Sequence, residues 1–421
     1  MIFKSMEVVY IILTVLFAGL IFTHKGISRF LIFIIGITFL PYGFYLAENI
    51  SSARVLNVAF WMSVIVSNED RKRLLSIPCK YAVFFLLFSF ILTGFFDGRF
   101  NFVVGTLKGL LVFFETFGYM LLGYISFCES KERQFVACLK RLSFIVCVYA
   151  FLCIMLGSDP LNAAIGFSDS FADDRNRVAS FYYNSHIAGL AESICLLILL
   201  YVKLKYKTKL FDDILIVLLV IALFMTKSRS ALLDFMAGAS VLYYLFIAKS
   251  KTKVKYILIA FIVLVVLYML FGSMIESKFG DAFLDDGGKT GGSNVVMRMQ
   301  QLYYSYQLFL KNPLFGNGFN YFWDVIAAEN GFLSSMLMGA ESYVFILLIE
   351  RGLIQIVANI VFFTCIYRYM FRQKCLESYL AIAMLTAFLV NSIVTGNLYK
   401  WPFAMLYIGF YLGFLQIKME K

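Results

Sequence analysis

Long apolar runs constrain the fold of this chain more than any other feature. A helix needs roughly 20 mostly apolar residues to cross the hydrocarbon core of a bilayer, and such runs recur from one end of the chain to the other. The chain is 61% hydrophobic and 15% charged, whereas soluble domains average roughly 25% charged residues. The sequence therefore predicts an all-α, polytopic membrane protein with one transmembrane domain over residues 1–421.

The apolar runs give the approximate positions of the membrane helices. We expect about 12–13 transmembrane helices, twelve being possible because the third run is short. The runs lie near 8–23, 30–47, 54–68, 80–96, 103–127, 142–157, 182–202, 211–226, 230–248, 254–273, 341–366, 377–395 and 401–417.

Basic residues cluster in alternate connectors between these runs. The clusters lie at 71–73, 131–141, 203–209, 249–255 and 368–374. Cytoplasmic loops carry an excess of Lys and Arg, so we place these connectors inside and the others outside. The net charge of +11 follows from this orientation, and we expect no nucleic-acid partner.

The longest outer connector, residues 274–340, is predicted to be a large structured loop on the outer side of the membrane. Ser293 has the character of an N-cap, and Asn312 with Pro313 ends the helix that follows. Apolar residues recur between them at helical spacing, namely Val296, Met299, Leu302, Tyr303, Tyr306 and Leu310. Long structured loops on a rigid scaffold commonly carry function, so we expect chemistry here.

Cations on the predicted outer face indicate an anionic ligand. Lys227 and Arg229 lie in a very short outer turn, where insertion disfavours positive charge. Arg177 stands at the outer end of another span, followed by Asn184 and His186. A guanidinium pairs with phosphate oxygens through two parallel hydrogen bonds. Each residue also has a reading without an anionic ligand. Arg177 could lie at the membrane interface, His186 could be a hydrogen-bonded core residue, and Arg229 could reach lipid headgroups.

Two further charged residues lie in or directly after the outer loop. Arg298 lies one turn into the predicted amphipathic helix, where the alternative is a solvated helix face. Glu341 precedes a strongly apolar run. A partly desolvated carboxylate there is a candidate general base, and the alternative is a residue that stabilises the helix N-terminus.

Charged residues inside apolar runs need partners, because burying an isolated charge in a bilayer is unfavourable. Lys108 and Glu115 share one face of the run at 103–127. They predict either the polar lining of a substrate path or a structural ion-pair network. Glu350 and Arg351 are interpreted as a structural pair.

Cysteine and histidine usage indicates no metal site and no disulfide framework. The eight Cys residues are scattered, mostly inside apolar runs, and the chain has two His residues. Free Cys in such surroundings behaves as a small apolar residue.

Three local patterns occur in order on the predicted outer face. They are T-K-S-R-S at 226–230, R-M-Q-Q-L-Y-Y-S-Y-Q-L-F-L-K-N-P-L-F-G-N-G-F at 298–319, and E-S-Y-V-F-I-L-L-I-E-R-G-L-I at 341–354. The segment 177–189 adds a looser match. Over roughly residues 175–355 the chain resembles the O-antigen polymerase and O-antigen ligase superfamily of bacterial glycosyltransferases.

The resemblance implies a multi-span, type C-like glycosyltransferase in the bacterial inner (cytoplasmic) membrane, with its active site facing the periplasm. The donor would be a glycan on undecaprenyl pyrophosphate, with no metal or other cofactor. Membrane lipids and a polysaccharide chain-length regulator are the other partners expected. The predicted site comprises Arg177, Arg229, Arg298 and Lys227 around the pyrophosphate, Asn184 and His186 in support, and Glu341 as the catalytic base.

Three functions remain open at this stage. Ligases of the superfamily carry a His where this chain has Glu341, which favours a repeat-unit polymerase. The alternative within the superfamily is an O-antigen ligase that transfers glycan to lipid A core. The alternative from another class is a flippase for lipid-linked glycans, although the sequence shows no repeated half of the kind that transporters often carry.

Overall fold

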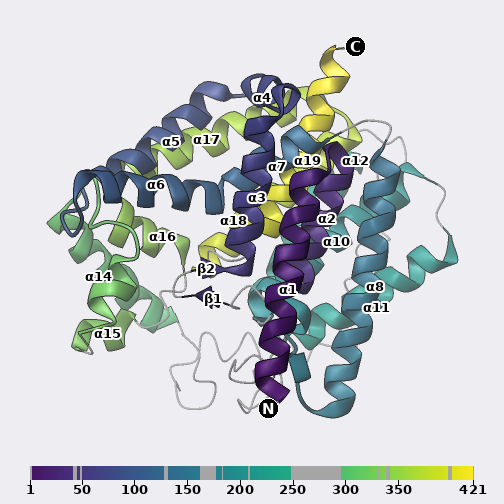
Figure 1. Ribbon diagram of the computed structural model, residues 1–421, viewed down its shortest axis with the longest axis horizontal. Coiled ribbons are helices and arrows are strands. Elements are labelled where there is room, and N and C mark those ends of the chain that lie inside the picture. The colour runs from purple at the N-terminus through teal and green to yellow at the C-terminus, as the bar shows by residue number, and fades with distance from the viewer. Residues whose placement is uncertain are drawn as a thin grey trace.

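The computed structural model describes residues 2–40, 45–47, 50–127, 131–161, 177–182, 184–206, 209–247, 295–329, 331–337, 342–396 and 401–420. Helices make up nearly all of it (Figure 1). The α-helices of the first half are α1 (Ile2–Thr23), α2 (Gly26–Phe39), α3 (Ser52–Val66), α4 (Asn68–Leu75), α5 (Lys80–Phe95), α6 (Phe102–Thr116), α7 (Gly118–Ser126), α8 (Glu132–Leu156) and α10 (Ser185–Lys205).

The second half continues this pattern. Its α-helices are α11 (Leu210–Met225), α12 (Arg229–Ile247), α14 (Val295–Lys311), α15 (Phe332–Leu337), α16 (Tyr343–Ile346), α17 (Gly352–Gln373), α18 (Leu376–Val394) and α19 (Trp401–Glu420). A 3-10 turn, η2, spans Ser180–Tyr182, and two π-helical turns, η3 and η4, span Phe322–Ile326 and Leu347–Arg351. The predicted all-α class is confirmed.

Five helical segments among the described residues are long and apolar enough to cross a membrane. They are α8, α10, α12, the segment Tyr343–Gln373 and α18. Two bent pairs, α4 with α5 and α6 with α7, raise the number to seven if each pair is one span. The chain is therefore a polytopic membrane protein. This number counts only the described residues, and it leaves out helices shorter than 18 residues, such as α2, with 14 residues, and α11, with 16.

Two of the predicted spans are not continuous helices. The run at 103–127 is not one helix, because it divides at Phe117 into α6 and α7, which are bent by 49°. The run at 30–47 ends as a helix at Phe39, since Leu40 precedes a proline and adopts extended backbone. The chain then forms two short antiparallel strands, β1 (Tyr45–Ala47) and β2 (Ile50–Ser51). The predicted span at 254–273 lies outside the described residues.

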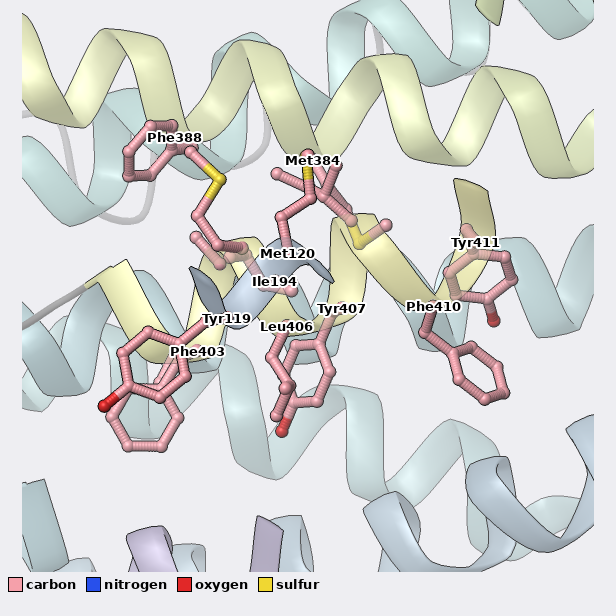
Figure 2. Close-up of a cluster of buried hydrophobic side chains, with 14 of the residues drawn as sticks. Tyr119, Met120, Ile194, Met384, Phe388, Phe403, Leu406, Tyr407, Phe410 and Tyr411 are labelled. Carbon is pink, nitrogen blue, oxygen red and sulfur yellow. The ribbon is translucent and has the colours of Figure 1, made fainter. Parts of the chain in front are cut away.

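The apolar core is centred on α19, which packs between α7, α10 and α18 (Figure 2). Helices α7 and α19 approach closely at two glycines. A Cβ atom at Gly123 would lie 2.1 Å from the carbonyl oxygen of Leu406, and one at Gly409 would lie 2.0 Å from that of Met120. Small residues let membrane helices pack backbone against backbone, so these glycines fix the centre of the bundle.

A charged cluster ties four helices together at the predicted cytoplasmic end. Lys205 Nζ at the end of α10 lies 2.8 Å from Glu132 of α8 and 2.8 Å from Glu377 of α18. Tyr201 donates a 2.6 Å hydrogen bond to Glu132, and Lys418 of α19 lies 3.7 Å from Glu377. Both carboxylates are buried, so Lys205 provides the charge that makes their burial tolerable.

Candidate active site

The predicted site residues of the middle of the chain lie around the start of α10. Asn184 is the N-cap of this helix, and its side-chain oxygen accepts hydrogen bonds from the backbone N–H groups of His186 (2.9 Å) and Ile187 (3.4 Å). Asn is among the preferred N-cap residues for this reason. Asn184 therefore has a structural role that also orients the first turn of α10, where His186 lies.

The turn between α11 and α12 packs directly on that first turn. His186 Nδ1 lies 2.9 Å from Ser228 Oγ and 3.3 Å from Ser230 Oγ. The two serine hydroxyls are 2.9 Å apart and are buried. One turn further along, a Cβ atom at Gly189 would lie 2.3 Å from that of Ala231. The absence of a side chain at Gly189 thus lets α10 and α12 lie side by side.

This contact brings two helix N-termini together at one place. The N-terminus of an α-helix carries about half a positive charge, from backbone N–H groups without intrahelical partners. Arg229 is the first residue of α12, and Lys227 precedes it with a left-handed backbone, φ 48°. Both side chains are half-buried. The region is therefore strongly electropositive and suited to an anion.

Arg177 joins the same region through the backbone. The N–H of Val178 donates a 3.2 Å hydrogen bond to the carbonyl of Met225, the last residue of α11. Arg177 thus lies next to the turn that carries Lys227 and Arg229, and its side chain is half-buried. The structure brings together five of the predicted residues, which are Arg177, Asn184, His186, Lys227 and Arg229.

Arg298 belongs to a different group of packed elements. It lies on α14, which packs on α15, α16 and η4, on the other side of the molecule from α10 and α12 (Figure 1). The predicted helix and its end before Pro313 are confirmed, whereas Ser293 lies outside the described residues. Arg298 is half-buried, on the α14 face that also carries the buried Gln301 and Ser305. A shared role with Arg229 stays a prediction.

Glu341 lies outside the described residues. The helix that follows begins at Tyr343, and its N-cap is Ser342, whose hydroxyl accepts a 3.2 Å hydrogen bond from the N–H of Val344. Glu341 therefore precedes the cap. Its role as a base and the alternative, in which it stabilises the helix N-terminus, both stay predictions.

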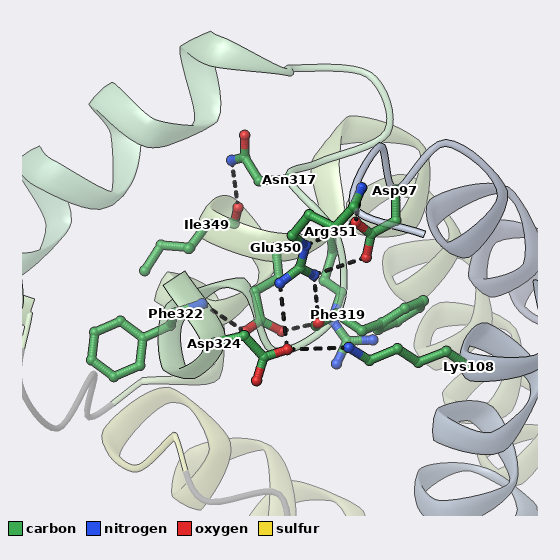
Figure 3. Close-up of polar contacts among 10 residues, drawn as sticks. Asp97, Lys108, Asn317, Phe319, Phe322, Asp324, Ile349, Glu350 and Arg351 are labelled. Carbon is green, nitrogen blue, oxygen red and sulfur yellow. Dashed lines mark hydrogen bonds and ion pairs between the residues drawn. The ribbon is translucent and has the colours of Figure 1, made fainter. Parts of the chain in front are cut away.

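A second polar cluster was not predicted from the sequence (Figure 3). Arg99, in the α5–α6 loop, binds the carboxylate of Asp97 at 2.8 Å and the carbonyl of Phe319 at 2.7 Å. Asp324 of η3 lies 3.4 Å from Arg99 and 3.2 Å from Lys108 of α6. Partial burial acts to lower the pKa of Arg99, but the hydrogen bonds and charge of Asp97 raise it above the ordinary value. Arg99 is therefore a permanent cation at the centre of this cluster.

The same cluster holds the N-P-L-F-G-N-G-F segment against η4. Gly318 N–H donates to the carbonyl of Glu350 at 3.1 Å, and the Asn317 amide donates to the carbonyl of Ile349 at 2.7 Å. Gly316 and Gly318 have positive φ values of 79° and 98°, which glycine adopts at little cost. This conformation explains why the motif contains two glycines, and it makes the segment a rigid support for α14.

The membrane-embedded charges have structural partners. Lys108 pairs with Asp324, and Glu115 pairs with Arg54 of α3. Glu350 and Arg351 are buried with 3.6 Å between their charged atoms. Of the two alternatives for Lys108 and Glu115, the structure supports the ion-pair network. Their partners lie 216 and 61 positions away in sequence, so the periodicity of one helix could not predict these ion pairs.

Within the described residues, no group of three or more His, Cys, Asp and Glu side chains is arranged to hold a metal ion. The free cysteines among them are half-buried or buried. The α10–α12 contact itself brings together cations, two serine hydroxyl groups and one imidazole.

The fold and this site define a class: a polytopic helical membrane protein with an electropositive site between helix N-termini. Residues 214–360 match the family model described as O-Antigen ligase. The match supports the place of the chain in the O-antigen ligase and polymerase superfamily and a ligase- or polymerase-type function in general. It contains Arg229, Arg298 and Glu341, whereas Arg177, Asn184 and His186 lie before it. No curated protein matches the chain.

Proposed function

We propose that this protein polymerises oligosaccharide repeat units linked to undecaprenyl pyrophosphate, at the periplasmic face of the bacterial inner membrane. The observation that carries the proposal is the contact between the starts of α10 and α12. It gathers His186, Lys227 and Arg229 at two helix N-termini. Arg229 also lies in the stretch that matches the O-antigen ligase family.

The proposed reaction uses these groups to stabilise a leaving pyrophosphate. The bond between the anomeric carbon of the donor glycan and the pyrophosphate oxygen breaks, and the anomeric carbon forms a bond to an acceptor hydroxyl. Negative charge develops on the departing pyrophosphate, and preorganised cations stabilise such charge effectively. Arg177 and Arg229, with Lys227, are the proposed pyrophosphate ligands at this contact. Arg298 is proposed as a further cation for the lipid-linked substrate, on α14, which packs on the other side of the molecule.

Glu341 is the proposed general base. It would accept the proton of the acceptor hydroxyl as the new glycosidic bond forms, so that undecaprenyl pyrophosphate leaves with its full negative charge. Asn184 and His186 would hold the first turn of α10 in place. The glutamate at 341 supports a polymerase, because ligases of the superfamily that the sequence resembles carry a His there. The acceptor is then a second lipid-linked repeat unit.

The deciding experiment compares lipopolysaccharide from cells that lack the protein with that from complemented cells. A polymerase predicts lipid A core carrying at most one repeat unit. A ligase instead predicts bare core with polymer retained on the undecaprenyl carrier, and that result would replace the proposal. Complementation with Arg229→Ala and Arg298→Ala should fail although both variants insert. Lys203→Ala, an exposed cation near the other end of α10, is the matched control.

A reconstituted assay separates the enzyme from a flippase. Purified protein in detergent, given lipid-linked repeat units, should lengthen them without any membrane gradient. The flippase would be supported if the protein neither lengthened the repeat units nor transferred them to lipid A core in this assay, but did translocate the glycan across the membrane of vesicles. A chain-length regulator added to the same assay should narrow the distribution of products without being required for the reaction.

A further inference from the structure

Helix α14 has an arrangement that its packing alone does not explain. Its apolar residues form an exposed stripe, and they fall within an arc of about 100° at 3.6 residues per turn. Met299 is 65% exposed and Tyr303 is 58% exposed. The complete stripe consists of Met299, Leu302, Tyr303, Tyr306 and Leu310. We call it the apolar stripe of α14.

The face that packs on the protein carries two polar side chains beside apolar Leu308, whereas the apolar stripe lies on an exposed face. Gln301 and Ser305 are fully buried, and Leu308 is buried beside them. Helices on the surface of a soluble domain show the reverse order, with the apolar stripe facing the core. An apolar stripe exposed in this way is typical of a helix that meets an apolar environment outside the protein.

A third face of α14 is exposed and polar. Gln300, Gln307 and Lys311 are exposed and fall within an arc of about 40°, directly beside the apolar stripe. Helices that lie in the plane of a membrane surface have this combination, with one apolar face in the acyl boundary and a polar face in water.

The apolar stripe continues into a surface on the membrane-spanning part of the chain. Phe315, just after α14, stacks on Phe96 at the end of α5 with ring centroids 3.8 Å apart. Beyond that contact, α6 presents exposed apolar side chains, such as Phe102 (63%) and Leu107 (59%). Trp323 of η3 is also 62% exposed. Tyr and Trp are enriched where proteins meet the headgroup region.

We propose that α14 is an interfacial helix whose apolar stripe inserts into the bilayer that surrounds the protein, at the boundary between headgroups and acyl chains. The occupant of this surface is bulk lipid. Gln300, Gln307 and Lys311 face water. Arg298 lies between the lipid-facing and protein-facing sides of the helix, so insertion holds its guanidinium at the depth of phosphate groups. The proposal does not depend on which glycan reaction the protein catalyses.

Depth-dependent fluorescence quenching tests the proposal on the full chain in lipid nanodiscs. The native tryptophans Trp61, Trp323 and Trp401 are replaced by Phe, and a single tryptophan is introduced as Tyr303→Trp or, as matched control, Gln307→Trp. We expect lipids with brominated acyl chains to quench the tryptophan at 303 and to spare the one at 307. Aqueous iodide should show the opposite order.

A second measurement uses the unmodified chain and so does not depend on how well the tryptophan variants fold. A phospholipid with a diazirine on its acyl chain is activated by light, and adducts are mapped by mass spectrometry. We expect adducts on Met299, Tyr303 and Tyr306, and none on Gln300 or Gln307. These adducts should persist when undecaprenyl pyrophosphate is added.

Three results would overturn the proposal. Quenching of the tryptophan at 303 by iodide but not by brominated lipid would place the apolar stripe in water. Loss of the lipid adducts on addition of undecaprenyl pyrophosphate would assign the stripe to the substrate tail. Cross-links between the apolar stripes of two chains, in place of lipid adducts, would assign it to a second copy.

Discussion

The imidazole of His186 and the hydroxyl of Ser228 lie 2.9 Å apart and join the first turn of α10 to the N-terminus of α12. These residues are 42 positions apart in the chain. Their contact keeps the two positive helix ends side by side, and it ties Arg229 to the position of His186. Together with the close approach of Gly189 to Ala231, it holds the two helix N-termini at the site.

Substitution of His186 tests whether it positions the site or transfers a proton. His186→Ala removes contacts to two buried hydroxyls, each hydrogen bond contributing about 1 kcal/mol, and we expect a clear loss of polymer with normal membrane insertion. His186→Asn can still bond Ser228 and should retain more activity than the Ala variant. Equal loss in both variants would argue against a positioning role. Ser240→Ala, at an exposed position on α12, is the control in the elongation assay.

Arg229 should not be replaceable by Lys. A lysine keeps the charge but cannot form the two parallel hydrogen bonds of a guanidinium with phosphate. Loss of one charge-assisted hydrogen bond removes about 1.5–3 kcal/mol, so we expect Arg229→Lys to slow elongation about tenfold or more. Arg133→Lys, at an exposed position, should have no effect. Near-normal chain length with Arg229→Lys would indicate that Arg229 acts only as a point charge.

Gly318 should be intolerant of any side chain. A Cβ atom there would lie 2.1 Å from the Asp97 carboxylate, which Arg99 holds in place, and the positive φ adds about 1–3 kcal/mol of strain. We expect Gly318→Ala to lower the melting temperature in detergent, measured by fluorescence-detected size exclusion. Gly98→Ala is the matched control, because a Cβ atom at Gly98 would meet nothing within 4 Å. Equal melting temperatures for the two variants would contradict this packing.

Lys205 should be essential for stability and not for binding substrate. Lys205→Met leaves two buried carboxylates, Glu132 and Glu377, without their shared cation. Removing one partner of a buried ion pair costs about 3–5 kcal/mol, so we expect a large fall in melting temperature. The triple variant Lys205→Met, Glu132→Gln, Glu377→Gln should recover part of the loss. Lys203→Met, whose side chain is 50% exposed, should change little.

The sequence by itself determined where helices form and which ones are apolar enough for a membrane. Local periodicity located α14, the proline after it marked its end, and the apolar runs located α10, α12 and α18. These features depend on neighbouring residues, so a single sequence carries them. The same patterns identified Arg177, Lys227 and Arg229 as unusual, because their charges stand out against apolar surroundings.

Only the tertiary structure decided which of these residues meet. The bend at Phe117, the pairing of Lys108 with Asp324, and the outward direction of the apolar stripe of α14 had no signal in the sequence. Each depends on packing between segments far apart in the chain, such as the 216 positions that separate Lys108 from Asp324. Periodicity predicts which residues share a face of one helix. Which other segment packs against that face depends on the tertiary packing of the whole bundle.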